Sequence, residues 1–396
     1  MKENILIVHN YYQVPGGEDT VVANERQMLE ENGHKVVLYS RNNSELSSYS
    51  LLRKLLLPIT TIFNYSTYMD IQQIIKEEKI DIVHVHNTLN IVSPSVYYAA
   101  LKMNVPVVQT IHNFRLLCPG ATFYRDNQIC EDCCKKGLLC SVKHGCYRNS
   151  KLQTLACVVS TKVHRIKRIY QKLFFICLTD FNKQKLLQLR QLQSKQIYVK
   201  PNFVQSKSKL LAYADRKDQF VYVGRLDELK GIRLLFETWK QIENEYNADT
   251  TELIVCGTGP LEQWCTEFIS ENNIKRIKLM GFIPNSEAIK IVGESKAIVL
   301  PTQWYEGFPM TIVEAASVGT PVIGSAIGNV GSIIQEGITG YQFNNKSSES
   351  LKNVIMTSEF DINDQVYEVY VKQYTKETNY RQLLECYQRA REYNGR

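Results

Sequence analysis

The sequence predicts an α/β protein made of two doubly wound domains in series, each with a parallel sheet covered by helices on both faces. Three observations favour this fold class. Short continuous apolar runs, typical of strands buried on both faces, alternate with segments of helical length. The same alternation returns in the second half, after a polar stretch. The 396 residues are 44% hydrophobic and 22% charged, which is ordinary globular composition for about two or three domains.

The first half begins with a strand, a loop and a helix. The loop at 13–17 contains Gly16 and Gly17, and the helix after it extends from Glu18 to Asn32, where Gly33 ends it. The expected strands are the apolar runs at 5–8, 36–39, 82–86, 107–111 and 174–178. They place the N-terminal domain at residues 1–201, with a cysteine-rich insertion at 118–146.

The second half repeats the alternation. Its expected strands are 220–223, 253–256, 277–280, 297–300 and 321–323, and its expected helices are 230–245, 260–272, 285–293 and 309–318. A polar linker at 202–218 opens this domain, which extends to residue 374. Residues 375–396 have apolar side chains at spacings of three and four, so we expect one helix there that packs toward the N-terminal domain.

The charge is divided unevenly between the halves. Residues 1–200 contain 26 Lys and Arg and 15 Asp and Glu, a net charge of +11; the remaining 21 and 25 give −4, and the sum is +7. A basic half suits an anionic partner such as lipid, nucleic acid or a phosphorylated small molecule. No uncharged apolar run reaches the length of a spanning helix, and the run at 5–8 is too short for a signal peptide. We therefore expect a cytoplasmic protein.

Ligands of open parallel sheets bind beyond the carboxyl ends of the strands, so the residues that follow strands are candidates for a site. Gly224 and Arg225 follow one expected strand, and Lys230 closes the same loop. An arginine fork and a lysine point charge suit a diphosphate, although two solvated surface cations explain the pattern equally well. Gly257 and Gly259 form a Gly-x-Gly turn after the next strand, which permits close backbone approach but needs no ligand.

The loop after the strand at 297–300 gives the strongest signal. Glu306 precedes a helix that starts near Pro309, and Glu314 lies within that helix, in an otherwise apolar run. An unpaired buried carboxylate is costly, so Glu314 is not readily explained as a structural residue. Both carboxylates can accept hydrogen bonds from vicinal hydroxyls. This loop therefore suits a ligand that contains a sugar.

These residues also resemble a known family. Glu306 and Glu314 match a Glu-x7-Glu motif, and Gly224-Arg225 with Lys230-Gly231 match its usual companion. With Gly16-Gly17 after the first strand, the chain resembles the retaining glycosyltransferases of family 4, especially bacterial members that build capsule, O-antigen or exopolysaccharide. The resemblance covers essentially the whole chain. It implies the GT-B fold, in which two Rossmann-like domains face a central cleft.

The resemblance implies transfer of a hexosyl or deoxyhexosyl group. The donor would be a nucleotide-diphosphate-sugar, and the acceptor a glycan or a polyprenyl-diphosphate-linked molecule. Arg225 and Lys230 would hold the donor diphosphate, Glu314 the ribose hydroxyls, and Glu306 the donor sugar. The other implied contacts are backbone amides of Gly307, Phe308 and Met310 at the sugar, Phe282 and Ile283 at the base, Gly16 and Gly17 at the phosphate and acceptor, and His112 near the donor sugar. Pro309 has no N–H, and many relatives have Gly-Leu in place of Pro309-Met310.

His112 follows the strand at 107–111. One histidine near a strand end is more often structural than catalytic, and only the match of residues 110–114 to the family reverses that preference. In the implied mechanism, Arg225 and Lys230 stabilise the departing phosphate, which assists deprotonation of an acceptor attacking on the same face of the sugar. The sequence contains no Asp-x-Asp tripeptide. We therefore expect no catalytic metal and no cofactor.

Six of the eleven cysteines lie between residues 118 and 146. They are Cys118, Cys130, Cys133, Cys134, Cys140 and Cys146. One Cys-x2-Cys pair is present without a second at zinc-ribbon spacing, so a structural zinc, buried thiols and an adventitious disulfide all remain open.

Two basic segments suggest contact with a membrane. Residues 162–172 alternate cations with apolar residues every three or four positions, as in an amphipathic helix, and residues 51–58 are a second candidate. Either could dock the enzyme on anionic lipid at the inner face of the cell membrane, as a peripheral protein. The alternative is a solvated helix face beside the core.

Other functions remain possible. A nucleotide-sugar epimerase or a non-catalytic partner subunit could share the GT-B fold. A nicotinamide oxidoreductase lacks support because no expected strand is followed by the complete glycine fingerprint. A nucleic-acid-binding module would explain the basic half but not Glu306 and Glu314, so we expect no nucleic-acid partner.

Overall fold

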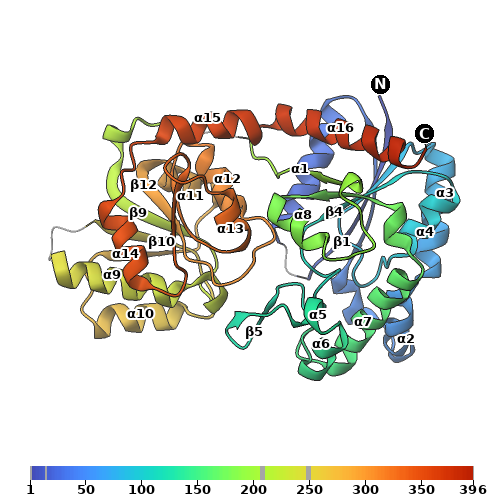
Figure 1. The fold of residues 1–396 in the computed structure, drawn as a ribbon, viewed down its shortest axis with the longest axis horizontal. Helices are drawn as coiled ribbons and strands as arrows, with labels where there is room; N and C mark the ends of the chain where they lie inside the picture. Colours follow the sequence, from blue (N-terminus) through green and yellow to red (C-terminus); the bar gives the residue numbers. More distant parts are fainter. Residues whose placement is uncertain (1, 14–15, 206–209, 247–250, 396) are drawn as a thin grey trace. The chain divides into compact units, whose positions relative to one another are not determined.

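The computed structural model describes residues 2–13, 16–205, 210–246 and 251–395. The chain forms two compact units (Figure 1). The N-terminal unit consists of residues 1–125, 130–201 and 379–396, and the C-terminal unit of residues 126–129 and 202–378. Part of the expected linker, 206–209, lies outside the described residues. Residues 213–215 of that linker form a 3-10 turn, and residue 217 already begins a strand.

The N-terminal unit is built on one parallel sheet. Its strands are β1 (Asn4–Tyr11), β2 (Lys35–Asn42), β3 (Ile82–Val85), β4 (Val107–Ile111), β7 (Phe174–Cys177) and β8 (Ile197–Val199), in the order β2-β1-β3-β4-β7-β8. Its helices are α1 (Gly17–Glu31), α2 (Leu51–Ile62), α3 (Tyr65–Glu78), α4 (Ser95–Lys102), α5 (Asp132–Lys135), α6 (Leu139–His144), α7 (Lys151–Ile166), α8 (Asp180–Leu186) and α16 (Lys376–Tyr393). The apolar run at 5–8 is buried throughout, as a strand covered on both faces requires.

The C-terminal unit is a second parallel sheet. Its strands are β9 (Lys217–Val223), β10 (Glu252–Cys256), β11 (Ile277–Gly281), β12 (Ser295–Leu300), β13 (Val322–Ser325) and β14 (Gly340–Phe343), in the order β11-β10-β9-β12-β13-β14. Its helices are α9 (Ile232–Tyr246), α10 (Glu262–Glu271), α11 (Asn285–Glu294), α12 (Met310–Ala316), α13 (Gly328–Ile333), α14 (Ser348–Thr357) and α15 (Asn363–Gln373). The strand order reverses between β9 and β12, and such a switch point is where ligands of this architecture bind.

Alternate residues of β9 pack on opposite faces of the sheet. Phe220 and Tyr222 belong to the core that contains Trp239 of α9, and Val221 belongs to the core that contains Ile312 of α12. Helices therefore cover both faces, which explains the continuous apolar strand pattern. The predicted class, two doubly wound α/β domains, is confirmed.

Helices α13, α14 and α15 and three strand features of the fold were not predicted. The strands β8 and β14 are short edge strands, and the hairpin of β5 (Tyr124–Arg125) and β6 (Gln128–Ile129) has only two residues in each strand. None of these segments has an apolar run long enough to register as a strand. The described residues contain no helix that combines the length and the apolar character needed to cross a bilayer.

The expectation of one amphipathic basic helix at 162–172 is wrong. Helix α7 ends at Ile166, and Arg168 adopts a left-handed conformation with φ of 53° before the 3-10 turn η2 (Ile169–Lys172). Ile169 and Leu173 are buried in the core rather than presented to solvent. Their spacing of three to four arises because the chain turns inward, and only the segment up to Ile166 lies on an exposed helix.

Candidate functional site

Two loops at the switch point of the C-terminal sheet bring together residues that are 76 positions apart. Gly224 and Arg225 directly follow β9, and the loop with Glu306 follows β12. The Lys230 ammonium Nζ lies 2.9 Å from Oε2 of Glu306, and the Glu306 side chain is largely buried. Arg225 is more exposed and lies 3.4 Å from a carboxylate oxygen of Asp227. The structure therefore joins one predicted cation directly to one predicted carboxylate.

The backbone around Lys230 fits closely against the loop after β12. Gly231 has a φ of 73°, and a Cβ atom there would lie 1.8 Å from the carbonyl oxygen of Pro301. The Asp227 side chain accepts a hydrogen bond from the Lys230 N–H at 3.0 Å and caps the 3-10 turn that carries this lysine. Only glycine at 231 permits this approach, so the turn holds Lys230 beside Glu306.

A cavity of about 360 Å³ lies in the same unit, at the end of β9 where Arg225 follows the strand. Its lining includes Gly224, Arg225, Gly257, Phe282, Ile283 and Asn285. Phe282 is exposed, and so offers an apolar face to a ligand. A Cβ on Gly257 would lie 1.9 Å from the Gly224 carbonyl oxygen, and one on Gly259 2.4 Å from that of Leu226. These two glycines are thus required for contact between neighbouring loops, independently of a ligand.

Glu314 lies on α12, beside the start of α11. Its Oε1 accepts a hydrogen bond from the Asn285 amide at 3.0 Å, and Asn285 lines the cavity. Burial raises the pKa of Glu314, and the hydrogen bond from Asn285 opposes that shift. Glu314 forms no ion pair within the described part of the chain. Its carboxylate therefore has capacity to accept further hydrogen bonds at the cavity rim.

Sequence reasoning missed three residues around the Glu306 loop. Asn285 is the first. The buried Asn329 amide donates to the carbonyl oxygens of Glu306 and Gly307, at 2.5 and 2.6 Å, and so fixes the backbone of the loop. Within the described residues, the indole N–H of Trp304 is buried without an acceptor. No local motif distinguishes these residues, because each acts through a contact with a distant segment.

The loop continues through Phe308 and Pro309 to Met310. Pro309 is the N-cap and Met310 the first residue of α12. Phe308 packs against a core that contains Val313 and Tyr370. Its side chain is therefore committed to packing, and only its backbone is available for the contact that the sequence suggests.

His112 lies in the N-terminal unit, where β3 and β4 end. Its Nε2 is 2.9 Å from Nδ1 of His86, and the two rings stack with centroids 5.2 Å apart. Both line a cavity of about 90 Å³ together with Asn87 and Arg115. Burial lowers the pKa of His112 to about 3 and holds the pKa of His86 well below its usual value. Both imidazoles are therefore neutral at physiological pH, and one donates a hydrogen bond to the other.

A buried ion pair lies behind these histidines. Glu25 of α1 accepts from the Lys200 ammonium at 2.7 Å, and Lys200 also donates to Asn379 of α16 at 2.9 Å. Burial favours neutral Glu25, but the charges of Lys200 and His84 hold its pKa below the usual value. The second Glu25 oxygen lies 3.5 Å from Nε2 of His86. A row of polar side chains thus connects the cavity at His112 to the core, and no motif in the sequence marks it.

The start of α1 carries the two glycines of the first loop. Gly16 is its N-cap and Gly17 its first residue, and both are exposed. The Asp19 carboxylate accepts from the Gly16 N–H at 2.8 Å and contacts His9 at 2.7 Å. Glu18 accepts from the Asn87 amide at 3.0 Å. Burial, with the charge of Asp19 adding to it, raises the pKa of Glu18 to about 7.

The chain matches two protein-family models, one in each half. Residues 15–133 match Glycosyltransferase Family 4, and residues 205–361 match Glycosyl transferases group 1. A solved structure of HepE from Anabaena in complex with UDP superimposes with a TM-score of 0.64 at 15% identity, over 97% of this chain and 99% of that one. The fold is that of the GT-B glycosyltransferases. The expectation of a GT-B architecture is thereby confirmed.

Two curated relatives of this GT-B chain differ in how far they match. An uncharacterized glycosyltransferase of Methanocaldococcus jannaschii is 25% identical over 190 residues, which is 46% of this chain and 47% of that protein. The match therefore spans about half of that relative's length. An uncharacterized 42.6 kDa protein in the cps region of Klebsiella pneumoniae is 24% identical over 313 residues, 78% of this chain and 74% of its own.

None of the six clustered cysteines of the GT-B chain forms a disulfide among the described residues. The Sγ atoms of Cys133 and Cys140 lie 3.6 Å apart, and Cys118 hydrogen-bonds Cys133. Within the described residues, no three cysteine Sγ atoms lie within 4.8 Å of one another. The sulfur atoms are thus not gathered around one point as a zinc site requires.

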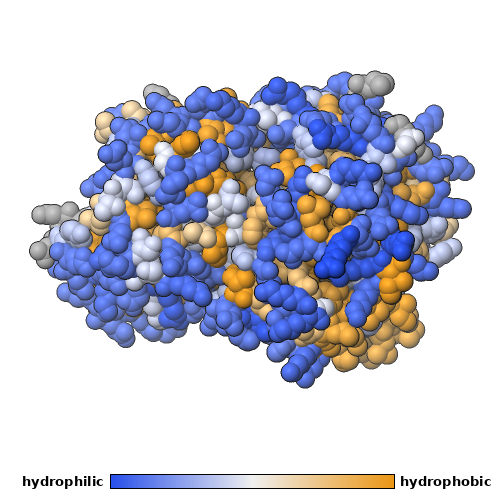
Figure 2. Space-filling model, viewed as in Figure 1, coloured by the Kyte–Doolittle hydropathy of each residue, from blue (hydrophilic) through white to orange (hydrophobic). Residues whose placement is uncertain are grey.

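The N-terminal domain also carries an exposed apolar surface. Helix α2 packs against α7, and side chains of both face solvent, among them Leu51, Leu52, Leu55, Ile59, Leu152 and Ile166, which we call the α2–α7 patch. Leu51, Leu55 and Leu152 are 82%, 76% and 80% exposed. Figure 2 shows hydrophobic side chains gathered at the lower right, where Figure 1 draws these two helices.

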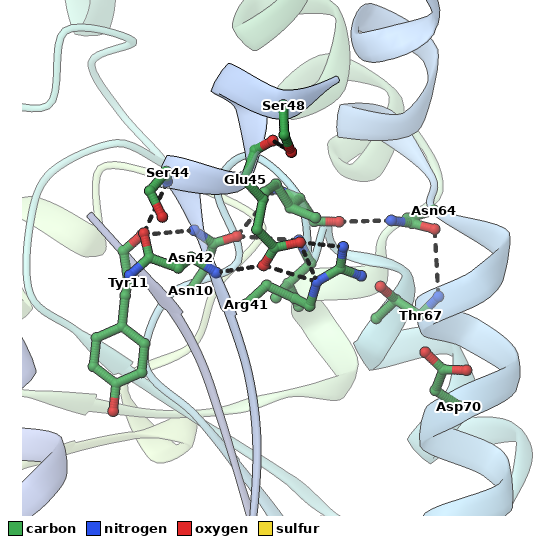
Figure 3. Close-up of polar contacts among 12 residues, drawn as sticks. Asn10, Tyr11, Arg41, Asn42, Ser44, Glu45, Ser48, Asn64, Thr67 and Asp70 are labelled. Carbon is green, nitrogen blue, oxygen red and sulfur yellow. Dashed lines mark hydrogen bonds and ion pairs between the residues drawn. The ribbon is translucent and has the colours of Figure 1, made fainter. Parts of the chain in front are cut away.

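Contacts at both ends hold α2 in place (Figure 3). Before it, Arg41 and Glu45 form a two-point ion pair that fixes the 3-10 turn η1 (Asn43–Ser48). After it, the Asn64 amide donates to the Ile91 carbonyl at 2.7 Å, and Asn64 also caps α3. The patch is therefore part of an anchored helix rather than of a loose segment.

Proposed function

We propose that the protein is a retaining glycosyltransferase of bacterial surface-polysaccharide synthesis. It moves a hexosyl or deoxyhexosyl group from a nucleotide-diphosphate-sugar to a glycan or a polyprenyl-diphosphate-linked acceptor. The observation that carries the proposal is the contact of Lys230 with Glu306 at the switch point of a domain that matches Glycosyl transferases group 1. HepE, which has the same fold, was solved with UDP, and the cps-region relative supports a polysaccharide product.

In the proposed binding mode, the base of the donor lies against Phe282 and Ile283, which line the C-terminal cavity. Its ribose hydroxyls donate to Glu314, whose hydrogen-bond partner Asn285 also lines that cavity. Its diphosphate lies between Arg225 and Lys230. An ammonium has three N–H donors, so Lys230 can keep its contact with Glu306 and still bind phosphate oxygens. Glu306 and the backbone amides after it then orient the sugar.

Charge development explains the chemistry. Breaking the bond between sugar and diphosphate leaves negative charge on the phosphate, and Arg225 and Lys230 stabilise it. The departing phosphate assists deprotonation of an acceptor that attacks on the same face of the sugar, which retains the anomeric configuration. His112 Nε2 is engaged with His86, which leaves Nδ1 for a ligand. We propose that this neutral imidazole contacts a sugar hydroxyl.

We propose that no metal ion or cofactor takes part. The sequence has no Asp-x-Asp tripeptide, and two cations are available for the diphosphate. Turnover in excess EDTA should equal turnover without it. Loss of turnover on chelation, with recovery on adding Mg²⁺ or Mn²⁺, would contradict this part of the proposal.

We propose that the protein works as a peripheral protein at the inner face of the cell membrane. The α2–α7 patch offers apolar side chains, and neither helix contains an acidic residue, whereas Arg53, Lys54, Lys151 and Lys162 are exposed cations on them. An apolar face flanked by cations is typical of helices that rest on anionic lipid.

The donor assignment is tested with a thermal-shift panel of UDP-, GDP- and ADP-linked sugars, because a ligand that binds the native state raises the melting temperature. We expect one donor to raise it by several degrees, and Lys230→Ala and Glu314→Ala each to abolish that rise. Lys290→Ala, which removes an exposed cation of α11, is the control. Unchanged donor binding and turnover in both site variants would refute the assignment. An epimerised nucleotide-sugar as the product would favour the epimerase alternative.

A further inference from the structure

A second cavity of the N-terminal unit lies between α2 and α7. Its volume is about 490 Å³. Leu57 and Pro58 of α2 and Leu152 and Ala156 of α7 form much of its wall, and Lys54, Tyr147 and Arg148 add charged and polar groups. Leu152 also belongs to the α2–α7 patch. The exposed apolar surface is therefore continuous with the wall of the cavity.

The two cations at this cavity have no acidic partner. Within the part of the chain that the structure describes, neither Lys54 nor Arg148 forms an ion pair. Arg148 stacks over the ring of Tyr147 at 5.7 Å. Because both cations are exposed and α2 and α7 contain no carboxylate, the site is complementary to an anion that lies against an apolar wall.

The cavity adjoins the one at His112. Thr61 and Cys157 line both. Tyr147 makes a second cation contact, with Arg115 at 5.2 Å, and Arg115 lines the smaller cavity. The Nε of Arg115 is buried without a hydrogen-bond partner among the described residues. Positive groups thus run from Lys54 and Arg148 past Tyr147 to the cavity that contains His112.

We propose that the cavity between α2 and α7 binds the acceptor through a polyprenyl diphosphate. The prenyl chain enters from the α2–α7 patch and lies against Leu57, Pro58 and Leu152. The diphosphate lies between Lys54 and Arg148, and the acceptor group beyond it reaches the cavity at His112. This inference rests on the proposed function, since it names the acceptor of that reaction.

Two features favour this occupant over a simple membrane headgroup or a free anion. A headgroup at the bilayer surface would be held as well by Lys151 or Lys162, and needs no apolar cavity. A free diphosphate would gain nothing from the walls formed by leucine and proline. A ligand with a charged group attached to a long apolar chain contacts both the cations and the apolar wall of the cavity.

The test is calorimetric titration with geranylgeranyl diphosphate, without detergent, vesicles or nucleotide-sugar. We expect it to bind at least about tenfold more tightly than geranylgeraniol or inorganic diphosphate, because each lacks one half of the recognised structure. Lys54→Gln should weaken binding about tenfold. Arg53→Gln is the matched control, since Arg53 is the neighbouring cation of α2 and does not line the cavity. It should change binding less than about twofold.

A second pair of variants tests the apolar part. Ala156→Trp fills the cavity and should abolish binding, whereas Val159→Trp, one turn along α7 and outside the cavity, should not. Equal losses in Lys54→Gln and Arg53→Gln, or inorganic diphosphate binding as tightly as the prenyl compound, would overturn the proposal. So would undiminished binding to Ala156→Trp with an unchanged melting temperature.

The assay separates this inference from the proposed function. If the prenyl diphosphate binds as described and no nucleotide-sugar binds the C-terminal unit, the acceptor site stands and the transferase proposal fails. If a nucleotide-sugar binds and the prenyl diphosphate does not, the transferase proposal stands and this acceptor site fails.

Discussion

Gly231 shows how one residue controls the geometry of the donor site. Its φ of 73° and the close approach of Pro301 both exclude a side chain, and the next residue back is Lys230. The sequence identified Lys230 and Glu306 as candidates by residue type and position after strands. It could not show that they touch, because that contact depends on how the loops after β9 and β12 lie at neighbouring strand ends.

Gly231→Ala should therefore destabilise the C-terminal unit. Gly337 is the matched control, with a φ of 70° and no atom within 4 Å of a Cβ. Gly337→Ala should cost about 1 kcal/mol in the free energy of unfolding, from backbone strain alone. Gly231→Ala should cost about 2 kcal/mol more, because Pro301 must move. Urea unfolding followed by tryptophan fluorescence measures both; equal losses would show that the loop adapts without strain.

Helix α2 shows what the structure adds to the sequence prediction for a single helix. The sequence predicted a basic apolar segment at 51–58, and the structure shows it as an exposed helix anchored at both ends. The prediction of an amphipathic helix over 162–172 was wrong because residue spacing cannot show where a chain turns inward. The short strands β8 and β14 were missed for a related reason, since edge strands lack the buried run that marks a central strand.

Removing leucines from α2 should weaken membrane binding without affecting the fold. Leu52 and Leu55 are exposed, so Leu52→Ser with Leu55→Ser should change stability by less than about 1 kcal/mol. Burial of a leucine contributes about 1.5–3 kcal/mol, so co-sedimentation with phosphatidylglycerol vesicles should fall at least about tenfold. Val371→Ser, at an exposed position of the C-terminal unit, is the control. Equal sedimentation of both variants would argue against docking through α2.

At the scale of the whole molecule, the two units should respond differently to pH. All seven histidines lie in the N-terminal unit, and all three tryptophans in the C-terminal one. Burial lowers the pKa of His84 to about 4 and of His112 to about 3, from 6.5. Below pH 6.5 these two histidines therefore bind protons in the unfolded chain but not in the folded chain. Each such histidine removes about 1.4 kcal/mol per pH unit as the pH falls from 6.5 toward 4.

Glu18 has the opposite effect. Its folded pKa of about 7 lies above the ordinary value of 4.5, so the stability it contributes is lost as the pH rises from 4.5 through 7. The two histidines together change the free energy of unfolding with pH more than the one carboxyl does. We therefore expect the N-terminal unit to be most stable near pH 6.5. Urea unfolding by circular dichroism should show a loss on going to pH 5 that tryptophan fluorescence does not. A loss seen equally by both probes would contradict the assignment to the histidines.

The sequence predicted both parallel sheets and the class of fold, because buried strands carry a continuous apolar signal along the chain. It could not predict the Glu25–Lys200 pair, the row of histidines or the cavity between α2 and α7. The ion pair and the cavity each join segments more than 90 residues apart, and the stacked His86 and His112 follow two different strands. Ordinary surface and core residues supply all three. A sequence motif can identify only residues that are close together in the chain, whereas the residues of these sites come together only in the folded structure.

The place of α16 has a consequence for biosynthesis. Asn379 hydrogen-bonds the buried Lys200, and Tyr387 hydrogen-bonds the buried His84. Until α16 has left the ribosome, the N-terminal domain lacks one hydrogen-bond partner of Lys200 and one of His84, both of which are buried. We expect a nascent chain stalled at residue 374 to hold an immature, protease-sensitive N-terminal half, even though every strand of that sheet has already been translated.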